Sequence, residues 1–476
     1  MVFSSYEMIF LFLPIVVIGY YALSQIEQSI FQKLFLVGAS LFFYAYFNPV
    51  YLIIILSSII INYLISKVIV RLDKALLYKK IVLAVGILFN IGLLGYFKYY
   101  DFFISNINAV FDTDFNLKNI ILPLGISFFT FQQLSFLISV YKKQEKIENL
   151  IDYSLFVVFF PQLVAGPIVL YSEMIPQFLD KRNRYLNHEN FAKGLYIFCI
   201  GLFKKTVIAD TIALFVDNGF GLSYFSAPTA WVVALSYTLQ IYFDFSGYSD
   251  MAIGLGKMFN IDIPANFTSP YTSESITVFW RRWHITLGRA LSTYVYIPLG
   301  GNRKGAVRTY LNLFVTFLVS GLWHGAAWTF VIWGALHGII VTTERLFTNL
   351  LAKIPKVIKI ACTFLTVNFL WVLFRATSFE QAINIYKGLF NFSDLSLSQI
   401  ATLNLDGIVQ FPGKIAILYV VGVLLLLTFV VFFTKNSLHR AENFKFSRKN
   451  LFETVILFVI SVIHLSRLST FIYFNF

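Results

Sequence analysis

The sequence predicts an all-helical protein that crosses a lipid bilayer many times. Of its 476 residues, 58% are hydrophobic and 13% are charged, whereas soluble domains carry about 25% charged residues. Apolar segments recur from one end of the chain to the other, and most Lys and Arg residues lie in short connectors between them. This combination is typical of a polytopic membrane protein, and we expect one membrane-embedded domain over residues 1–476.

The expected crossings follow the apolar segments in order. Each crossing needs roughly 20 apolar residues, and the segments predict about eleven crossings. Several segments contain Pro, Gly or charged residues, which predict broken, re-entrant or interfacial helices among the crossings. The segments lie near residues 8–24, 33–47, 51–70, 80–104, 120–141, 151–169, 191–216, 228–256, 310–345, 357–376, 414–434 and 451–471.

The net charge of +13 is interpreted as an orientation signal. Basic residues between spans face the cytoplasm and contact lipid headgroups, so the charge does not indicate nucleic-acid binding. The basic connectors after Ser66 and around Arg440 are expected to be cytoplasmic, which places the N-terminus outside. The first segment lacks a basic start and a cleavage site, so we interpret it as a retained span. Cys199 and Cys362 lie far apart in apolar runs and predict neither a disulfide nor a metal site.

Residues 257–308 form a long polar and aromatic insertion, which is unusual between spans unless it is functional. Its centre, FWRRWHITLGR, contains Arg281, Arg282, Trp283, His284 and Arg289. On a continuous helix, Arg281, His284 and Gly288 would share one face, and Arg282 and Arg289 another. Two interpretations fit equally well. The segment is a basic interfacial helix on phospholipid, or it is a phosphate clamp for a nucleotide or pantetheine donor, because Arg binds phosphate bidentately.

His324 lies in SGLWHGAAW, inside a run over residues 309–343 that contains no Asp, Glu, Lys or Arg. An ionisable residue deep in a span is by default a functional candidate. Gly321 and Gly325 flank it at a spacing that allows close backbone approach, and Trp323 offers a wall. No acid or second histidine lies three or four positions away, so a metal pair is not expected. Imidazole exchanges a proton near neutral pH, which suits proton abstraction from a hydroxyl or thiol.

A second candidate is Asp244, which lies with Asp250 in the otherwise apolar sequence IYFDFSGYSDMAIGLG. A buried carboxylate needs a partner, and Arg281 or Arg282 are the expected partners. The sequence FFPQLVAGPI at 159–168 contains two prolines and a glycine, which predict a broken helix beside a pocket.

The remaining histidines are interpreted as structural or solvated. His188 and His439 lie in charged connectors, and His464 is expected to make a structural hydrogen bond. His337 follows His324 by more than three helical turns, so on one straight helix the two would be roughly 20 Å apart and would not share a site. We therefore expect His337 to be a packing residue.

Together the motifs resemble those of the membrane-bound O-acyltransferase family. Within that family the chain is most similar to the membrane subunits of alginate O-acetylation and to peptidoglycan O-acetyltransferases, and less similar to the D-alanyl transferases of teichoic acids. The resemblance runs nearly end to end through MVFSS, GYFKYYDFF, LPLGISFFTFQ, FFPQLVAGP, QIYFDFSGYSDMAIGLG, ITVFWRRWHITL, YIPLGGNRKG, GLWHGAAWTFVIWGALHG, FLWVLFRA and FIYFNF.

The resemblance implies a ring of membrane helices with a thin central region, where funnels from both faces meet near His324. It implies that His324 is catalytic and that His284 supports it. The implied donor is cytoplasmic acetyl-CoA, with no bound cofactor and no metal. The implied partner is a periplasmic or extracellular SGNH-type hydrolase-like acetyltransferase, which acetylates a polysaccharide acceptor outside a bacterial cytoplasmic (inner) membrane.

A mechanism follows from these expectations. His324 acts as general base on an attacking hydroxyl, and its imidazolium then protonates the leaving thiolate; an acetyl-histidine intermediate stays open as an alternative. Candidate substrate-binding residues are Trp323, Arg281, Arg282, Trp283 and Asp244. Two other functions compete with this one: a flippase that moves a lipid-linked sugar, and a scaffold that recruits the external partner.

Overall fold

The computed structural model describes residues 1–404, 412–465 and 472, and these residues form helices and turns without any strand. The prediction of an all-helical protein is confirmed. Six helices in the described residues are long and apolar enough to cross a membrane, so the chain is a multi-pass membrane protein. These are Glu7–Gln25, Val50–Arg71, Leu76–Phe111, Gly305–His324, Lys356–Arg375 and Gly413–Phe433. The number of crossings stays a prediction, and the terminal motif FIYFNF lies outside the described residues except for Ile472.

The chain divides into two compact units, each assembled from segments that are distant in sequence. The first unit contains residues 1–198 and 248–265, and the second contains residues 199–247 and 266–476. Two helices, α10 (His188–Phe203) and α12 (Ala227–Met258), contribute residues to both units. The single membrane-embedded domain stays a prediction.

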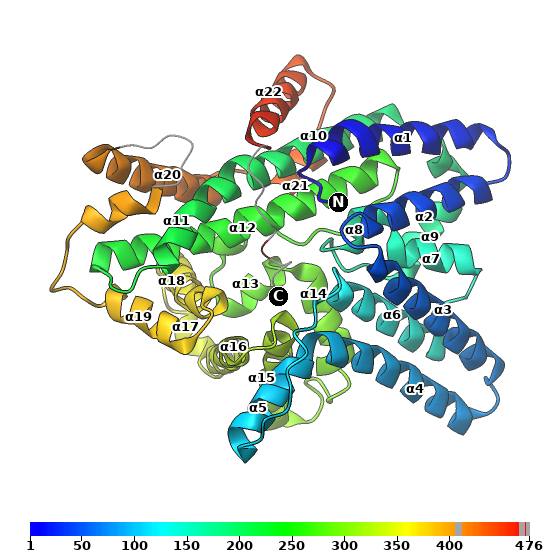
Figure 1. Ribbon diagram of the computed structural model, residues 1–476, viewed down its shortest axis with the longest axis horizontal. Coiled ribbons are helices and arrows are strands. Elements are labelled where there is room, and N and C mark those ends of the chain that lie inside the picture. Colours follow the sequence, from blue (N-terminus) through cyan, green and yellow to red (C-terminus); the bar gives the residue numbers. More distant parts are fainter. Residues whose placement is uncertain (405–411, 466–471, 473–476) are drawn as a thin grey trace. The chain divides into compact units, whose positions relative to one another are not determined.

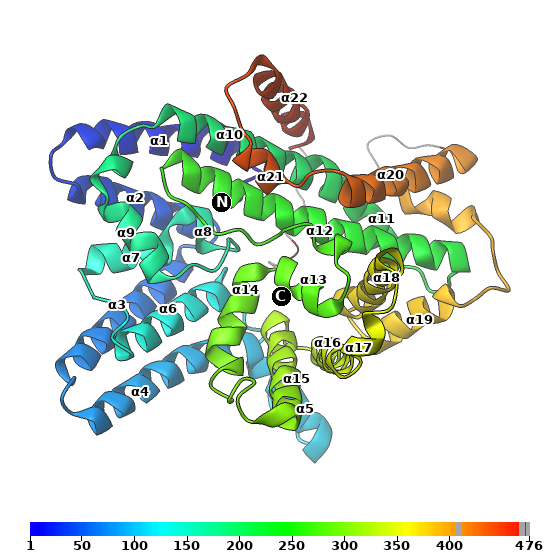
Figure 2. The same cartoon turned by 180° about the vertical axis from the view of Figure 1, so that it is seen from behind.

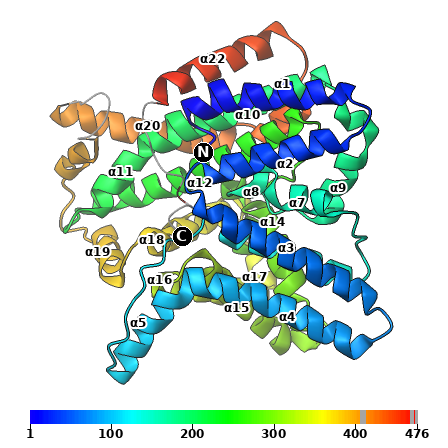
Figure 3. The same ribbon diagram turned by 45° about the vertical axis from the view of Figure 1, so that its right-hand side comes forward.

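In the first unit, successive helices are joined by short connectors and pack as neighbours, as the blue helices α1 to α4 show in Figures 1 and 3. Polar side chains link these helices where they are buried, as is usual between membrane helices. Asn62 and Asn90 exchange side-chain hydrogen bonds of 3.2 and 2.6 Å. The helices of this unit are η1 (Glu7–Phe12), α1 (Leu13–Ala22), η2 (Leu23–Gln25), α2 (Ile30–Ala45), α3 (Val50–Arg71), α4 (Leu76–Leu94), η3 (Gly95–Tyr99), α5 (Tyr100–Phe111), α6 (Ile126–Tyr141), α7 (Leu150–Val158), α8 (Phe160–Leu163), α9 (Tyr171–Leu179) and η4 (Lys181–Arg184).

The predicted break in the segment 151–169 is confirmed. Helix α7 ends at Val158, and the next helix, α8, begins with Pro161 in its first turn and ends at Leu163. Proline fixes its own backbone angle and has no N–H to donate, so it fits the start of a helix and interrupts a longer one. The pocket expected beside this break stays a prediction.

The second unit carries most of the polar insertion and the histidine-rich motifs. Its helices are η5 (Lys204–Ala209), α11 (Asp210–Phe220), η6 (Pro270–Thr272), α13 (Ile276–Arg282), α14 (Ile285–Leu291), η7 (Ser292–Tyr296), α15 (Gly305–His324), α16 (Trp328–Leu346), α17 (Thr348–Leu351), α18 (Lys356–Arg375), α19 (Phe379–Leu389), η8 (Ser398–Asn404), α20 (Gly413–Phe433), α21 (Ser437–Glu442) and α22 (Arg448–His464). Figure 2 shows α13 to α18 grouped in this unit.

The segment 310–345 was predicted as one span, and this prediction is wrong. Helix α15 ends at His324, residues 325–327 are not helical, and α16 begins at Trp328. The two helices fold back and pack against each other through glycines. A Cβ atom added to Gly321 would lie 2.3 Å from the Phe330 carbonyl oxygen, and one added to Gly334 would lie 2.5 Å from the Phe317 carbonyl oxygen. Only glycine permits so close an approach of two backbones.

Candidate active site

The second unit contains a cavity of about 1100 Å³ whose walls come mainly from α13, α14, α15, α16 and α18. Four residues of α15 line it: Leu313, Thr316, Phe317 and Ser320. Residues three and four apart share one face of a helix, and the next position on this face is His324, the last residue of α15. The cavity therefore runs along the face of α15 that His324 continues, and it stops at Ser320, one turn before His324, which does not itself line it.

His324 is only 2% exposed and is surrounded by aromatic rings. Its ring centroid lies 5.0 Å from that of Trp323, 5.3 Å from that of Trp333 and 5.1 Å from that of Phe374, all in edge-to-face arrangements. Trp333 and Phe374 are at most 1% exposed. These rings keep water away from the imidazole and fix the plane in which it lies.

His284 does not lie inside a helix, so the predicted continuous faces through this segment are wrong. Helix α13 ends at Arg282, Trp283 is extended, and His284 takes the left-handed backbone angles φ 46° and ψ 52° before α14 begins. A bulky residue takes this conformation only where its surroundings hold it there. Here Asn266 does so: its backbone oxygen accepts from Ile285 N at 3.1 Å.

The Asn266 side chain also fixes the state of the His284 ring. Asn266 Oδ1 accepts from Thr286 Oγ1 at 2.7 Å and lies 3.3 Å from His284 Nδ1. Because that oxygen can only accept, His284 Nδ1 carries the proton and Nε2 is the acceptor. Burial lowers the pKa of His284 to about 3, so the ring is neutral at physiological pH.

Trp323 contacts both candidate histidines. Its ring centroid is 5.9 Å from that of His284 and 5.0 Å from that of His324. The His284 ring also lies in the wall of the cavity. The structure thus brings His284 and His324, which are 40 positions apart in sequence, into contact with one indole.

The arginines predicted to bind substrate lie in different surroundings in the structure. Arg281 and Arg289 line the cavity, and so does Arg345 of α16, which sequence reasoning did not single out. Arg282 instead donates through Nη1 to Thr272 Oγ1 at 3.2 Å. Trp283 is 1% exposed, and its ring lies 5.0 Å from that of Trp371, so it packs inside the unit.

Asp244 is buried, but its cation is Lys205 rather than the predicted Arg281 or Arg282. Lys205 Nζ lies 2.7 Å from Asp244 Oδ1 and 2.8 Å from Asp210 Oδ1. The backbone N–H of Ile472 donates to Asp244 Oδ2 at 2.9 Å. The three side chains form a buried ion cluster, which satisfies the need of buried charges for partners. The signal that sequence reasoning missed is Lys205 itself, a charge inside the apolar segment 191–216.

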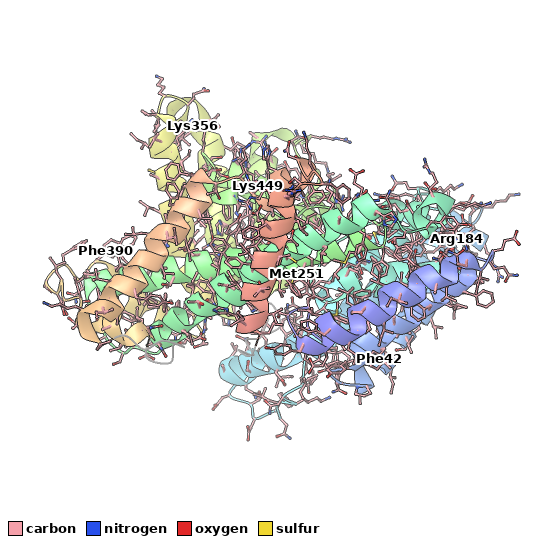
Figure 4. All side chains as sticks on the ribbon, turned by 90° about the horizontal axis from the view of Figure 1, so that it is seen from above. Phe42, Arg184, Met251, Lys356, Phe390 and Lys449 are labelled. Atoms are coloured by element: carbon pink, nitrogen blue, oxygen red, sulfur yellow. The ribbon has the colours of Figure 1, made fainter. Side chains whose placement is uncertain are left out.

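Acidic residues of the cavity wall anchor the start of α13. Glu344 of α16 accepts from the backbone N–H of Ile276 at 2.6 Å and of Thr277 at 3.0 Å. Just before α13, Glu274 lies 2.8 Å from Lys359 Nζ and 3.6 Å from Nζ of Lys356, which Figure 4 labels on the first turn of α18. Helices α16 and α18 therefore fix the helix that carries Arg281.

His337 lies close to His324 in space, contrary to prediction. The expected separation assumed one straight helix, whereas the turn at 325–327 places the two residues on packed helices. Both rings contact Trp333: its centroid lies 5.3 Å from that of His324 and 4.7 Å from that of His337.

Comparisons with known proteins point to a single family. The sequence model of the membrane-bound O-acyltransferase family (MBOAT) matches residues 142–381. The chain is 42% identical to the peptidoglycan O-acetyltransferase of Helicobacter pylori, over 100% of this chain and 98% of the relative. It is 43% identical to the probable alginate O-acetylase of Pseudomonas putida, over 86% of this chain and 84% of the relative. Similarity to the teichoic acid D-alanyltransferase of Bacillus subtilis is 27% identity over 48% of this chain and 60% of the relative.

Proposed function

Because this chain belongs to the membrane-bound O-acyltransferase family and is an enzyme of the acyltransferase class, we propose that it takes an acetyl group from cytoplasmic acetyl-CoA and passes it across the membrane. The final acceptor is a hydroxyl of an extracytoplasmic polysaccharide, of the peptidoglycan or alginate kind that the relatives' names give. A periplasmic SGNH-type hydrolase-like partner completes the transfer, and the enzyme resides in the bacterial cytoplasmic membrane.

One observation carries this proposal: the cavity follows a stripe of α15 residues up to Ser320, and the next position on that stripe is His324. A thioester that entered the cavity along this stripe would bring its carbonyl carbon to within about one helical turn of the imidazole. A volume of about 1100 Å³ slightly exceeds the range of pockets that bury a small-molecule ligand, about 300–1,000 Å³. The cavity thus has room for most of a coenzyme, not only for an acetyl group.

The proposed chemistry is a single acyl transfer. The acceptor oxygen attacks the acetyl carbonyl carbon, and His324 takes the proton of the acceptor hydroxyl as the new C–O bond forms. The C–S bond breaks, and the imidazolium returns its proton to the leaving thiolate, giving an acetyl ester and free CoA. His324 is the last residue of α15, where the helix dipole favours a transient positive charge. The surrounding rings exclude water that would otherwise hydrolyse the thioester.

His284 has a positioning role in this scheme. Its Nδ1–H is fixed on Asn266, which leaves Nε2 as a neutral acceptor at the cavity wall. An acceptor in this place can hold a second hydroxyl of the acceptor, so that the attacking hydroxyl is free to donate its single proton to His324. The left-handed backbone at His284 sets the direction in which the ring points.

The arginines of the cavity wall are suited to bind the phosphates of the coenzyme. Arg281, Arg289 and Arg345 line the same cavity as Ser320. Guanidinium groups bind phosphates bidentately, so we assign these three arginines to the phosphates of CoA. Replacing all three by Gln should raise KM for acetyl-CoA about tenfold, as expected for loss of charged hydrogen bonds. The KM for acetyl-pantetheine, which has no phosphate, should not change, and an equal rise for both donors would contradict the assignment.

The first experiment uses the purified full chain with labelled acetyl-CoA, alone and with an oligosaccharide acceptor and the partner. Thiol release should depend on His324 and be lost in His324→Ala. The matched control is His188→Ala, since His188 is exposed at the start of α10, and it should release thiol like the wild type. Release that survives His324→Ala would refute His324 as the base, and absence of release from the wild type under all conditions would refute the proposed function.

Cys362 offers a second, independent test of the donor cavity. Its thiol is exposed and lines the cavity, whereas Cys199 is buried. A maleimide should label Cys362 and leave Cys199 unmodified. Acetyl-CoA should slow the labelling of Cys362, because the bound coenzyme covers it. Labelling at an unchanged rate in saturating acetyl-CoA would place the donor elsewhere.

A further inference from the structure

Trp280 lies at the boundary between the cavity and the aromatic rings around His324. It is half-buried and lines the cavity. Its ring centroid lies 5.7 Å from that of Phe317, a second cavity residue, and 5.6 Å from that of Trp333. Trp333 in turn contacts the His324 ring at 5.3 Å. Trp280 therefore lines the space open to a ligand and also contacts a ring, Trp333, that packs against the catalytic imidazole.

The Trp280 indole is held by a directional bond from another helix. Its Nε1–H donates to Nδ1 of His337 at 3.2 Å, and the two ring centroids are 5.0 Å apart in an edge-to-face arrangement. Because His337 Nδ1 accepts, its proton is on Nε2. His337 is 1% exposed and stacks with Phe317 at 6.2 Å. A buried hydrogen bond costs free energy to leave unmade, so His337 keeps Trp280 in one position.

This arrangement limits the space beside the thioester carbonyl. A rigid wall discriminates against a chain that is one methylene too long by about 10- to 200-fold. Displacing Trp280 to admit a longer chain would break the bond to His337 and disturb the rings that hold His324. Trp280 is a cavity residue whose ring contacts Trp333 beside His324, so a limit on chain length close to the imidazole would act through it.

We propose that Trp280, held in place by His337, is the residue that sets the acyl-chain length and restricts the enzyme to acetyl donors. This inference rests on the proposed function, because it concerns the same donor cavity. It assigns Trp280 a specificity-determining role and His337 a positioning role, whereas the sequence alone predicted only packing for His337.

The test compares donors of different chain length on the full-length protein. Acetyl-, propionyl-, butyryl- and hexanoyl-CoA are compared by kcat/KM for thiol release. Binding is followed separately by thermal stabilisation with non-cleavable ketone analogues of the same lengths. The variants are Trp280→Ala, Trp280→Phe, His337→Phe and His337→Asn. Trp231→Ala is the matched control, since Trp231 also donates its indole N–H, at 3.1 Å, but to the Leu389 carbonyl oxygen.

The expected result is a change in preference rather than a general loss. Trp280→Ala should reduce the preference for acetyl over butyryl at least tenfold, the lower limit for one methylene, and Trp280→Phe should shift it in the same direction. His337→Phe removes the acceptor and should relax the preference, whereas His337→Asn supplies an oxygen near the place of Nδ1 and should restore it. Trp231→Ala should keep the wild-type preference.

Other outcomes overturn the inference in distinguishable ways. If the wild type cleaves acetyl-CoA in a His324-dependent manner and the Trp280 variants keep its chain-length profile in both rate and binding, this inference fails and the proposed function stands. If His337→Phe and His337→Asn behave alike, the positioning role of His337 fails. If the wild type binds and cleaves none of the thioesters, the proposed function fails, and the inference fails with it.

Discussion

Gly321→Ala tests whether the close approach of α15 and α16 sets the position of His324. A Cβ atom at residue 321 would lie 2.3 Å from the Phe330 carbonyl oxygen and 3.1 Å from Gly334 Cα, whereas ordinary contacts begin at 3.4 Å. Both neighbours are backbone atoms, which cannot turn away as a side chain can. The two helices must therefore separate by about 1 Å, and the overpacking should lower the free energy of unfolding by about 1–3 kcal/mol.

The same displacement should reach the catalytic site. His324 follows Gly321 within one turn of α15, so it moves with the helix. A misplacement of about 1 Å at a catalytic group can lower the rate about 100-fold. Because Gly321 faces α16 and does not line the cavity, kcat for thiol release should fall about 100-fold while KM for acetyl-CoA changes little.

The assay is steady-state thiol release together with thermal unfolding in detergent. The matched control is Gly422→Ala in α20, where an added Cβ atom meets nothing within 4 Å. That control should keep the wild-type kcat and should gain stability, because Ala favours a helix over Gly by up to about 1 kcal/mol. A wild-type kcat in Gly321→Ala would show that this helix contact does not position His324.

Three other substitutions test separate parts of the site. Lys205→Met leaves Asp210 and Asp244 buried without their cation and should lower the free energy of unfolding by about 3–5 kcal/mol; unchanged thermal unfolding would contradict the ion cluster. In His284→Asn, the new residue tolerates the left-handed backbone and offers an amide N–H to Asn266, but Nε2 is lost. The free energy of unfolding should therefore change by at most about 1 kcal/mol, while the rate of thiol release falls at least tenfold. Full activity of this variant would remove His284 from the mechanism. Glu344→Gln removes one of the two acceptor oxygens at the start of α13 and should lower the free energy of unfolding by about 1–2 kcal/mol. Because α13 carries Arg281, KM for acetyl-CoA should rise more than kcat falls. A fall in kcat alone would contradict the role of Glu344 as an anchor of α13.

The fold class could be predicted from sequence because it depends on local composition. An uninterrupted apolar run needs only its own backbone hydrogen bonds to be stable in lipid, and Val50–Arg71 and Gly413–Phe433 appear where they were expected. The break after Val158 was also predictable, because two prolines mark it. The turn at 325–327 carries no proline or charge, so the sequence predicts one span over 310–345.

The geometry of the site could be predicted only in part, because it depends on contacts between distant residues. His324 was singled out by its own isolation in an uncharged run. The left-handed backbone of His284 results from hydrogen bonds to Asn266, eighteen residues earlier. No residue next to His284 in the sequence predicts this conformation. Likewise, Lys205 is the partner of Asp244 because η5 packs against α12. The sequence contains several other cations, so this pairing could not be predicted from it.

The ion cluster of Lys205, Asp210 and Asp244 has a consequence for how the chain enters the membrane. A lone Asp or Lys at the centre of an inserting helix costs about 2.5–3.5 kcal/mol. Lys205 and Asp210 emerge from the ribosome before Asp244, which is carried by the following helix, α12. Lys205 and Asp210 balance each other's charge, and Asp244 then adds a second carboxylate that shares Lys205 Nζ and accepts from the N–H of Ile472. The insertion cost of Asp244 is therefore offset only where α12 packs against Lys205 of η5, so we expect η5 and α12 to associate as α12 enters the bilayer.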